Sequence, residues 1–261
     1  MQGKLLFLGT GASVGVPMIG CPCAVCHSPS PFNHRLRPSA LIEIGNKRFL
    51  IDVGPDFRQQ ALQYGIDYLD GVLLTHAHYD HTAGLDDLRP LCFRRKYPLP
   101  FLLSQATAEE IERRYDYLFH TTAYPQDNGL PRFNLHRLTE ERGEVEFEGI
   151  NWQYVSYWQG GMLVKGFRVG QLAYLTDIYD FPHTLFDDLQ GVEILVISAL
   201  RHDKSPIHFS IEEAVTFAQQ LQARETWLIH LSHNLEYEAT NALLPPNVRL
   251  AYDGLTLTFG A

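Results

Sequence analysis

Residues 76–81 read His-Ala-His-Tyr-Asp-His, and this cluster constrains the fold of the chain more than any other feature. It directly follows residues 71–75, a short apolar stretch that predicts a buried strand. A loop leaving the end of a strand can direct the first two histidines to one side, while the aspartate and the last histidine begin a helical turn and face a second point nearby. Imidazole and carboxylate are ligands for zinc, manganese or iron. The four candidate metal ligands are His76, His78, Asp80 and His81.

Two-metal hydrolases hold their ions about 3.5–4 Å apart, so a single loop can supply ligands to both. The alternative is a polar loop whose histidines only form hydrogen bonds. Four ligand-type residues within six positions, directly after a buried strand, favour the metal site.

The apolar patterns along the chain predict a single α/β domain over residues 1–261, because no repeat, low-complexity segment or linker divides it. Strands come first and then alternate with helices, which predicts two sheets with helices on their outer faces. One helix is expected to begin after Ser210, with Glu213 at the capping-box position. The expected strands are 5–8, 40–44, 48–52, 71–75, 145–157, 163–169, 171–176, 193–199, 226–231 and 255–259; the other expected helices are 57–64, 84–97 and 107–118, and residues 120–133 are expected to form a surface loop.

The charge balance bears on the class of substrate. The net charge is −9, from 30 acidic and 21 basic residues, which disfavours nucleic acid as a partner and favours a small molecule. No apolar run approaches the roughly 20 residues of a membrane span. The apolar stretch within residues 1–9 is too short for a signal peptide, so we expect a cytoplasmic protein.

Three of the four cysteines lie close together as Cys21, Cys23 and Cys26. Three thiolates at this spacing suit a tetrahedral structural zinc site, which needs a fourth ligand. In a reducing compartment such a cluster more often binds metal than forms disulfides, although a redox or incidental cluster remains the alternative. The fourth cysteine, Cys92, is expected to be a buried apolar residue.

The cluster at 76–81 resembles the signature of the metallo-β-lactamase superfamily, and the resemblance extends over nearly the whole chain. It implies a four-layer αββα sandwich with the active site at the edge between the two sheets. It also implies two further ligands, the bridging Asp177 in Leu175-Thr176-Asp177 and His230 in Leu228-Ile229-His230. Asp52 matches an aspartate that orients the ligands and does not bind metal itself.

The sequence departs from the superfamily pattern at one ligand. Relatives carry a further histidine a few residues before a Gly-aromatic strand, and here Gln159 occupies that place ahead of Gly166-Phe167. A glutamine carbonyl is a poor zinc ligand beside imidazole. Three outcomes are open: a two-metal site completed by Gln159 or water, a one-metal site, or loss of catalysis.

Within the superfamily, residues 9–17 and the cysteine motif resemble the phosphodiesterases related to the carbon–phosphorus lyase pathway. That resemblance implies His233 as the fourth ligand of the structural zinc. It also implies that His208 faces the substrate as a general acid or a phosphate ligand, since its ordinary pKa of about 6.5 suits proton donation. Arg201, after the 193–199 strand, is a candidate to bind a phosphate or carboxylate, with a surface ion pair as the alternative.

The resemblance implies a metal-dependent phosphodiesterase in which a metal-activated hydroxide attacks small cyclic phosphates, such as ribosyl 1,2-cyclic phosphate or 2′,3′-cyclic nucleotides. Asp80 and His208 are the candidate catalytic residues. The expected cofactors are a structural zinc and one or two divalent ions of zinc, manganese or iron. The alternatives are a non-catalytic metal-binding protein, prompted by Gln159, and an endonuclease resembling the transfer-RNA 3′-processing enzymes. Relatives are often homodimers.

Overall fold

Two seven-stranded sheets form the centre of the molecule. The computed structural model describes residues 1–93, 95–119 and 133–261, so most of the expected loop at 120–133 lies outside the described residues. The first sheet has the order β14-β1-β2-β3-β4-β5-β6, and the second has the order β13-β12-β11-β10-β9-β8-β7. The strands of the first sheet are β1 Gln2–Gly9, β2 Ser39–Ile44, β3 Lys47–Ile51, β4 Gly71–Leu73, β5 Leu99–Ser104, β6 Phe133–Leu138 and β14 Thr256–Gly260. Those of the second are β7 Gly143–Phe147, β8 Ile150–Gln159, β9 Met162–Val169, β10 Leu172–Leu175, β11 Ile194–Ser198, β12 Glu225–Ile229 and β13 Val248–Leu250.

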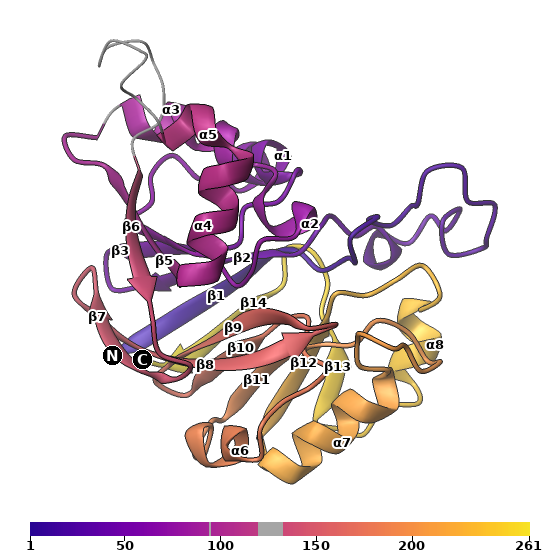
Figure 1. The fold of residues 1–261 in the computed structure, drawn as a ribbon. Coiled ribbons are helices and arrows are strands. Elements are labelled where there is room, and N and C mark those ends of the chain that lie inside the picture. The colour runs from indigo at the N-terminus through magenta and orange to yellow at the C-terminus, as the bar shows by residue number, and fades with distance from the viewer. Residues whose placement is uncertain (94, 120–132) are drawn as a thin grey trace.

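The helices divide between the outer faces of the two sheets, which gives the order helix, sheet, sheet, helix in Figure 1. On the first sheet lie α1 Phe57–Tyr64, α2 Tyr79–Thr82, α3 Arg89–Phe93, α4 Gln105–Arg114 and α5 Asp116–Phe119, with the 3-10 turn η2 Leu85–Leu88. On the second lie α6 Thr184–Asp188, α7 Ile211–Leu221 and α8 Tyr237–Asn241. The αββα sandwich predicted from the sequence is thus confirmed. Among the described residues, no helix has the length and apolar character that crossing a bilayer requires.

Three apolar clusters match these layers. One lies between the sheets and includes Phe7, Phe49, Trp152 and Tyr174. The other two lie between each sheet and its own helices. Because β11 has helices on one face and the other sheet on the opposite face, all five of its residues are buried, as is usual for a central parallel strand.

Helix α7 shows how the sequence sets the position of one element. Ser210 caps it: its side chain accepts from the Glu213 backbone N–H, and the Glu213 carboxylate accepts from the Ser210 backbone N–H. The capping box predicted from the sequence is therefore confirmed. Ile211, Ala214 and Phe217 recur at helical spacing and turn one face of α7 onto the second sheet.

Three strands were missing from the sequence prediction, namely β5, β6 and β13. The single strand expected over 145–157 is also wrong, because a turn at Glu148 and Gly149 divides it into the antiparallel pair β7 and β8. All six residues of β5 are buried, so it lacks the alternation that distinguishes a strand from a buried helix. β13 has three residues, too few for a pattern. The helix expected over 84–97 is wrong in its extent, because the chain forms only η2 and α3 before residue 94.

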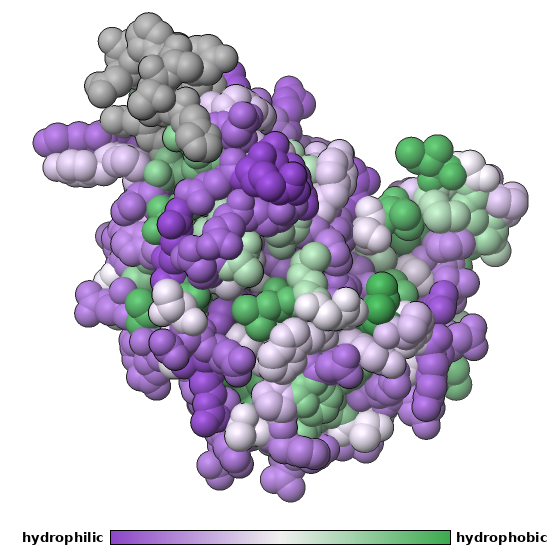
Figure 2. Space-filling model, in the orientation of Figure 1, coloured by the Kyte–Doolittle hydropathy of each residue, from purple (hydrophilic) through white to green (hydrophobic). Residues whose placement is uncertain are grey.

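The connection from β1 to β2 leaves the body of the sandwich and forms an arm, residues 10–38, with the short 3-10 turn η1 Pro31–Asn33 near its base (Figure 1). Arg35, only 1% exposed, fixes this base by donating to the carbonyls of Ser232 and Leu235 at 3.0 and 2.9 Å. Figure 2 shows hydrophobic residues on the surface of the arm, where Ile19 is 99% exposed.

Candidate metal centre

The candidate site lies where parallel strands end. β3, β4 and β5 run parallel in the first sheet, and β10, β11 and β12 run parallel in the second. The carboxyl ends of parallel strands meet at one edge of a sheet, which is where ligands bind in open α/β sheets. Asp52 follows β3, the 76–81 cluster follows β4, Asp177 follows β10 and His230 follows β12.

Four side chains from these strand ends converge. The Nε2 atom of His81 lies 3.2 Å from Asp177 Oδ2 and 3.4 Å from Asp80 Oδ2. The Nε2 atom of His230 lies 3.3 Å from Asp177 Oδ1 and 3.4 Å from Asp80 Oδ2. All four residues are at least 95% buried. The ligand atoms of Asp80, His81 and His230 all lie within 4.8 Å of one another, as do those of His76, His81 and Asp177.

His76 and His78 lie at the side of this group. Their Nε2 and Nδ1 atoms are 2.9 Å apart. His76 is fully buried, whereas His78 is partly exposed. The structure thus brings the four ligands predicted from the cluster at 76–81 together with Asp177 and His230, the two that the family resemblance implies.

The unpaired atoms and the donor chemistry fit a divalent cation. His81 Nε2 is buried and has no hydrogen-bond partner, while its Nδ1 lies 2.7 Å from Asp52 Oδ2. A metal-ligating histidine characteristically holds one ring nitrogen against a carboxylate and presents the other to the ion. Tetrahedral bonds of about 2.0–2.2 Å place ligand atoms about 3.3–3.6 Å apart, close to the separations observed here.

Burial and charge act against each other in this cluster. Burial lowers the pKa of His81, but the carboxylates of Asp80, Asp52 and Asp177 outweigh it and raise that pKa well above its usual value. The same balance raises the pKa of His230. For Asp177, burial raises the pKa, but His230 and His81 outweigh it and hold the pKa well below its usual range.

Three residues of the site adopt a left-handed backbone conformation. Asp52, Asp177 and His230 have φ angles of 58°, 56° and 58°. Non-glycine residues in this region cost about 1–3 kcal/mol and concentrate at functional sites. Each one turns the chain sharply at the end of its strand and directs a ligand-type side chain inward.

Two threonines that the sequence analysis passed over support the ligands. Thr75 donates from its backbone N–H and its hydroxyl to Asp52 at 2.9 and 2.8 Å. Thr176 donates to Asp177 Oδ2 at 2.6 Å. The sequence did contain a clue to both threonines, because each lies just after a strand and directly before a ligand-type residue. Thr75 also joins the two sheets, because its carbonyl accepts from the Lys165 backbone N–H at 2.9 Å.

Gln159 ends β8 inside the cluster and is 3% exposed. Its Nε2 donates to Asp177 Oδ1 at 2.8 Å and lies 3.0 and 3.2 Å from the two ring nitrogens of His208. His208 therefore also belongs to the cluster. Burial, followed by the nearby charge of His230, lowers the pKa of His208 to about 4.

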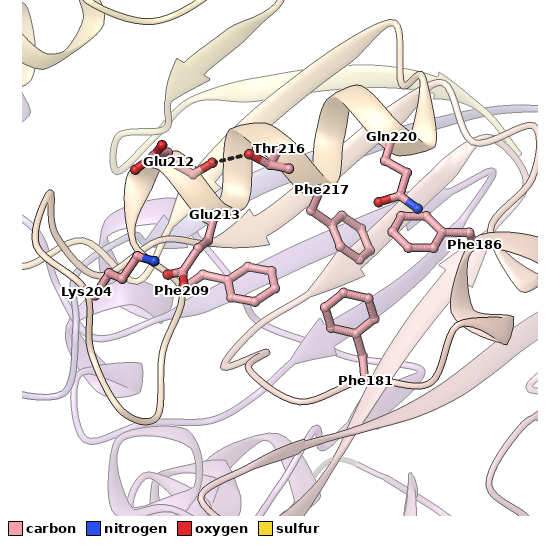
Figure 3. A pocket seen from close by; sticks show the side chains of 9 residues that line it. All are labelled: Phe181, Phe186, Lys204, Phe209, Glu212, Glu213, Thr216, Phe217 and Gln220. Carbon is pink, nitrogen blue, oxygen red and sulfur yellow. Dashed lines mark hydrogen bonds between the residues drawn. The ribbon is translucent and has the colours of Figure 1, made fainter.

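The residue after His208 is anchored in a group of phenylalanines. Phe209 lies 5.9 Å from Phe181 and 6.1 Å from Phe217 between ring centroids. These rings line a pocket of about 330 Å³ between α7 and the 181–186 segment, with Lys204 at one end (Figure 3). The rings fix one end of the 199–209 loop, so His208 is held against the cluster. Arg201, in the same loop, donates to the Lys204 carbonyl at 3.3 Å.

A second group of ligand-type residues lies in the arm. Cys21, Cys23, Cys26 and His233 have ligand atoms within 4.8 Å of one another. His233 Nδ1 lies 3.3 Å from Cys21 Sγ and 3.4 Å from Cys23 Sγ. The hydrogen bond from His233 and that from the Cys26 backbone lower the pKa of Cys23 to about 6, which favours the thiolate that binds zinc. Cys92 is buried at a distance, beside the first sheet.

The comparisons with known proteins agree with this geometry. The family described as "Beta-lactamase superfamily domain" matches residues 47–231. A solved structure described as a new diphosphatase from the PhnP family is 38% identical, with a TM-score of 0.91, over 99% of this chain and 98% of that one. The buried cluster of histidines and aspartates lies at the strand ends of this fold and consists of ligand types that suit a divalent metal ion. The chain belongs to the metallo-β-lactamase superfamily and, within it, to a PhnP-like subfamily.

Two curated relatives carry other names. An octanoyltransferase of Porphyromonas gingivalis is 39% identical over 257 residues, which is 97% of this chain but 51% of that protein, so the chain spans about half its length. A ribonuclease Z of Bradyrhizobium sp. (strain ORS 278) is 36% identical over 87 residues, which is 33% of this chain and 24% of that protein.

Proposed function

We propose that this chain is a metal-dependent phosphodiesterase that acts on small phosphate esters, with cyclic phosphates of the ribosyl 1,2-cyclic or 2′,3′-cyclic nucleotide type as the leading candidates. One observation carries the proposal. Two carboxylates and two imidazoles, from Asp80, His81, Asp177 and His230, are buried at the strand ends and approach one another within 3.2–3.4 Å.

The residues that would hold divalent cations are His76, His78, Asp80, His81, Asp177 and His230. When bound, zinc, manganese or iron would supply Lewis-acid activation of water and of the phosphoryl oxygens. Asp177 contributes both carboxylate oxygens, since Oδ2 faces His81 and Oδ1 faces His230. Asp80 faces the same two rings, and Asp52 keeps His81 oriented.

The exposed edge of the site indicates how substrate approaches. His78 and His208 are the partly exposed members of the cluster, and Tyr79 and Ile207 beside them are 66% and 41% exposed. A small molecule can reach this edge with its phosphate toward Asp80 and Asp177. Binding of the anionic group requires that the acidic cluster be neutralised, which bound cations would do. Arg201 is a second candidate for binding the anion.

Further parts of the proposal concern the whole protein. We expect a structural zinc at Cys21, Cys23, Cys26 and His233, a single domain over residues 1–261, a cytoplasmic location and assembly as a homodimer. The octanoyltransferase name belongs to a protein about twice as long, so it does not bear directly on this region. Similarity to ribonuclease Z keeps transfer-RNA 3′ processing as an alternative substrate, which the net charge of −9 disfavours.

The test is hydrolysis by the manganese- or zinc-loaded protein of 2′,3′-cyclic nucleotides, ribosyl 1,2-cyclic phosphate, a dinucleoside diphosphate and a precursor transfer RNA. We expect turnover of the small phosphate substrates and a loss on the order of 100-fold or more in His81→Ala, since even residues that only support metal ligands cost 10–100-fold. The control His183→Ala removes an exposed histidine at the start of α6. Metal binding without turnover of any of these substrates would favour the non-catalytic alternative.

A further inference from the structure

The amide of Gln159 joins two side chains of the cluster. Its Nε2 donates to Asp177 Oδ1 at 2.8 Å and contacts the His208 ring nitrogens at 3.0 and 3.2 Å. The orientation of the amide follows from chemistry, because the opposite orientation would place two acceptor oxygens against each other. The Oε1 atom is left buried without a hydrogen-bond partner. Gln159 therefore presents its donor, and not its carbonyl oxygen, to the atoms around it.

His208 occupies a position that suits a metal ligand. Its Nδ1 lies 3.5 Å from Asp177 Oδ1, and its ring stacks on that of His230 at 4.9 Å between centroids. Asp177 Oδ1 is also 3.3 Å from His230 Nε2. The ligand atoms of Asp177, His208 and His230 all lie within 4.8 Å of one another. The separations of 3.5 and 3.3 Å match the edges of about 3.3–3.6 Å expected around a tetrahedral ion bound by nitrogen and oxygen.

We propose that His208 supplies the imidazole ligand that position 159 lacks, and that Gln159 is a positioning residue that holds His208 and Asp177 together. This inference rests on the proposed metal binding and assigns a ligand set to it. Two imidazoles and one carboxylate, with a further position open, are a usual set for a catalytic divalent ion such as zinc. Imidazole is also the better ligand, since an amide carbonyl binds zinc weakly beside it.

The loop that carries His208 is fixed at both ends. The Leu200 N–H donates to the Phe209 carbonyl at 2.9 Å, and the Ile211 N–H donates to the Arg201 carbonyl at 2.9 Å. Phe209 packs into the phenylalanine group shown in Figure 3. A ligand needs this kind of support, because the geometry around a metal tolerates little displacement.

The experiment is cobalt(II) titration of the metal-free chain, followed by absorption spectroscopy. Cobalt bound by the cysteines gives thiolate charge-transfer bands in the near ultraviolet together with visible d–d bands, whereas cobalt bound by imidazole and carboxylate gives visible d–d bands alone. The visible-band site is therefore the one whose d–d bands rise without a rise in the thiolate bands. We expect His208→Ala to lower the affinity of the visible-band site at least tenfold and to change its spectrum, with the thiolate bands unchanged. Gln159→Ala is expected to weaken that site by about 10–100-fold, as residues that orient ligands do.

His202→Ala is the control, because His202 is an exposed histidine of the same loop. Gln159→His in the His208→Ala background is expected to restore cobalt affinity, since it returns an imidazole to the site.

Retained thiolate bands show that each variant is folded, and His208→Gln replaces His208→Ala if the latter does not fold. Unchanged visible bands and affinity in the His208 variants would overturn the inference while leaving the proposed function intact. If the unsubstituted protein showed no visible bands beyond those that rise with the thiolate bands, both would be overturned.

Discussion

The Nδ1 atom of His81 lies 2.7 Å from the Oδ2 atom of Asp52, and both side chains are completely buried. The two residues come from adjacent parallel strand ends, β3 and β4, and the contact directs the other ring nitrogen of His81 toward Asp80 and Asp177. Asp52 also accepts both hydrogen bonds from Thr75, at 2.9 and 2.8 Å. One carboxylate thus fixes the start of the ligand-bearing loop and the orientation of its last histidine.

Replacement of Asp52 by asparagine should therefore weaken metal binding without removing a ligand. We expect a 10–100-fold loss of zinc or manganese affinity at the active site, because a neutral amide neither orients nor polarises the His81 ring as a carboxylate does. Isothermal titration calorimetry on the metal-free protein measures this directly. Asp70→Asn is the control, since Asp70 pairs with Lys47 away from the cluster. Equal affinity in the two variants would mean that Asp52 has no such role.

Metal binding at the active site should release protons near pH 7. Despite burial, neighbouring carboxylates raise the pKa values of His81 and His230 above the usual value, so these rings hold protons that a metal ion must displace. Affinity should therefore rise between pH 6 and 8, and calorimetry in buffers with different ionisation heats should give a positive proton count. Proton uptake, or affinity that falls as the pH rises, would contradict this balance of charges.

The same shifts predict how the stability of the metal-free protein depends on pH. A histidine whose pKa is raised in the folded state stabilises it fully below the unfolded pKa of about 6.5, and this contribution is lost as the pH rises through the folded pKa. The contribution of His81 and His230 should thus be larger near pH 6 than near pH 9. Urea unfolding at the two pH values, with His81→Gln for comparison, measures it. If the free energy of unfolding of the His81→Gln variant depended on pH in the same way, His81 would contribute nothing to this pH dependence.

The cysteines of the arm should differ in reactivity when zinc is removed. The hydrogen bonds from His233 and from the Cys26 backbone lower the pKa of Cys23 to about 6, whereas burial raises that of Cys26 to about 11. Since the thiolate is the nucleophile, iodoacetamide at pH 7 should modify Cys23 before Cys26. Peptide mapping by mass spectrometry gives the order in which the two cysteines are modified. Added zinc should suppress the modification of both. Faster modification of Cys26 would be incompatible with these environments.

Much of the site was predictable because its residues are close together in sequence. The ligand types at 76–81 follow one strand, and the cysteines at 21–26 lie within six positions. The more distant partners, Asp177, His230 and His233, came from family resemblance, because no local pattern relates them to those clusters. The fold was predictable to the level of layers, since alternation and helical spacing mark most elements.

The remaining features depend on contacts that sequence patterns do not encode. β5 is buried throughout and shows no period. The left-handed backbone at Asp52, Asp177 and His230 exists because the surrounding structure imposes it, not because these residue types prefer it. The contact between Gln159 and His208 joins residues 49 positions apart, on β8 and on the loop before α7, so no sequence pattern indicates that Gln159 contacts His208.

The central claim is that the strand ends around Asp80, His81, Asp177 and His230 hold divalent cations. Anomalous X-ray diffraction from crystals of the zinc- or manganese-loaded protein tests it most directly. The account predicts an anomalous peak about 2.0–2.2 Å from ligand atoms of Asp177 and His230, besides the zinc among Cys21, Cys23, Cys26 and His233. Anomalous density only at the cysteines, with the aspartates and histidines still paired to one another, would contradict it.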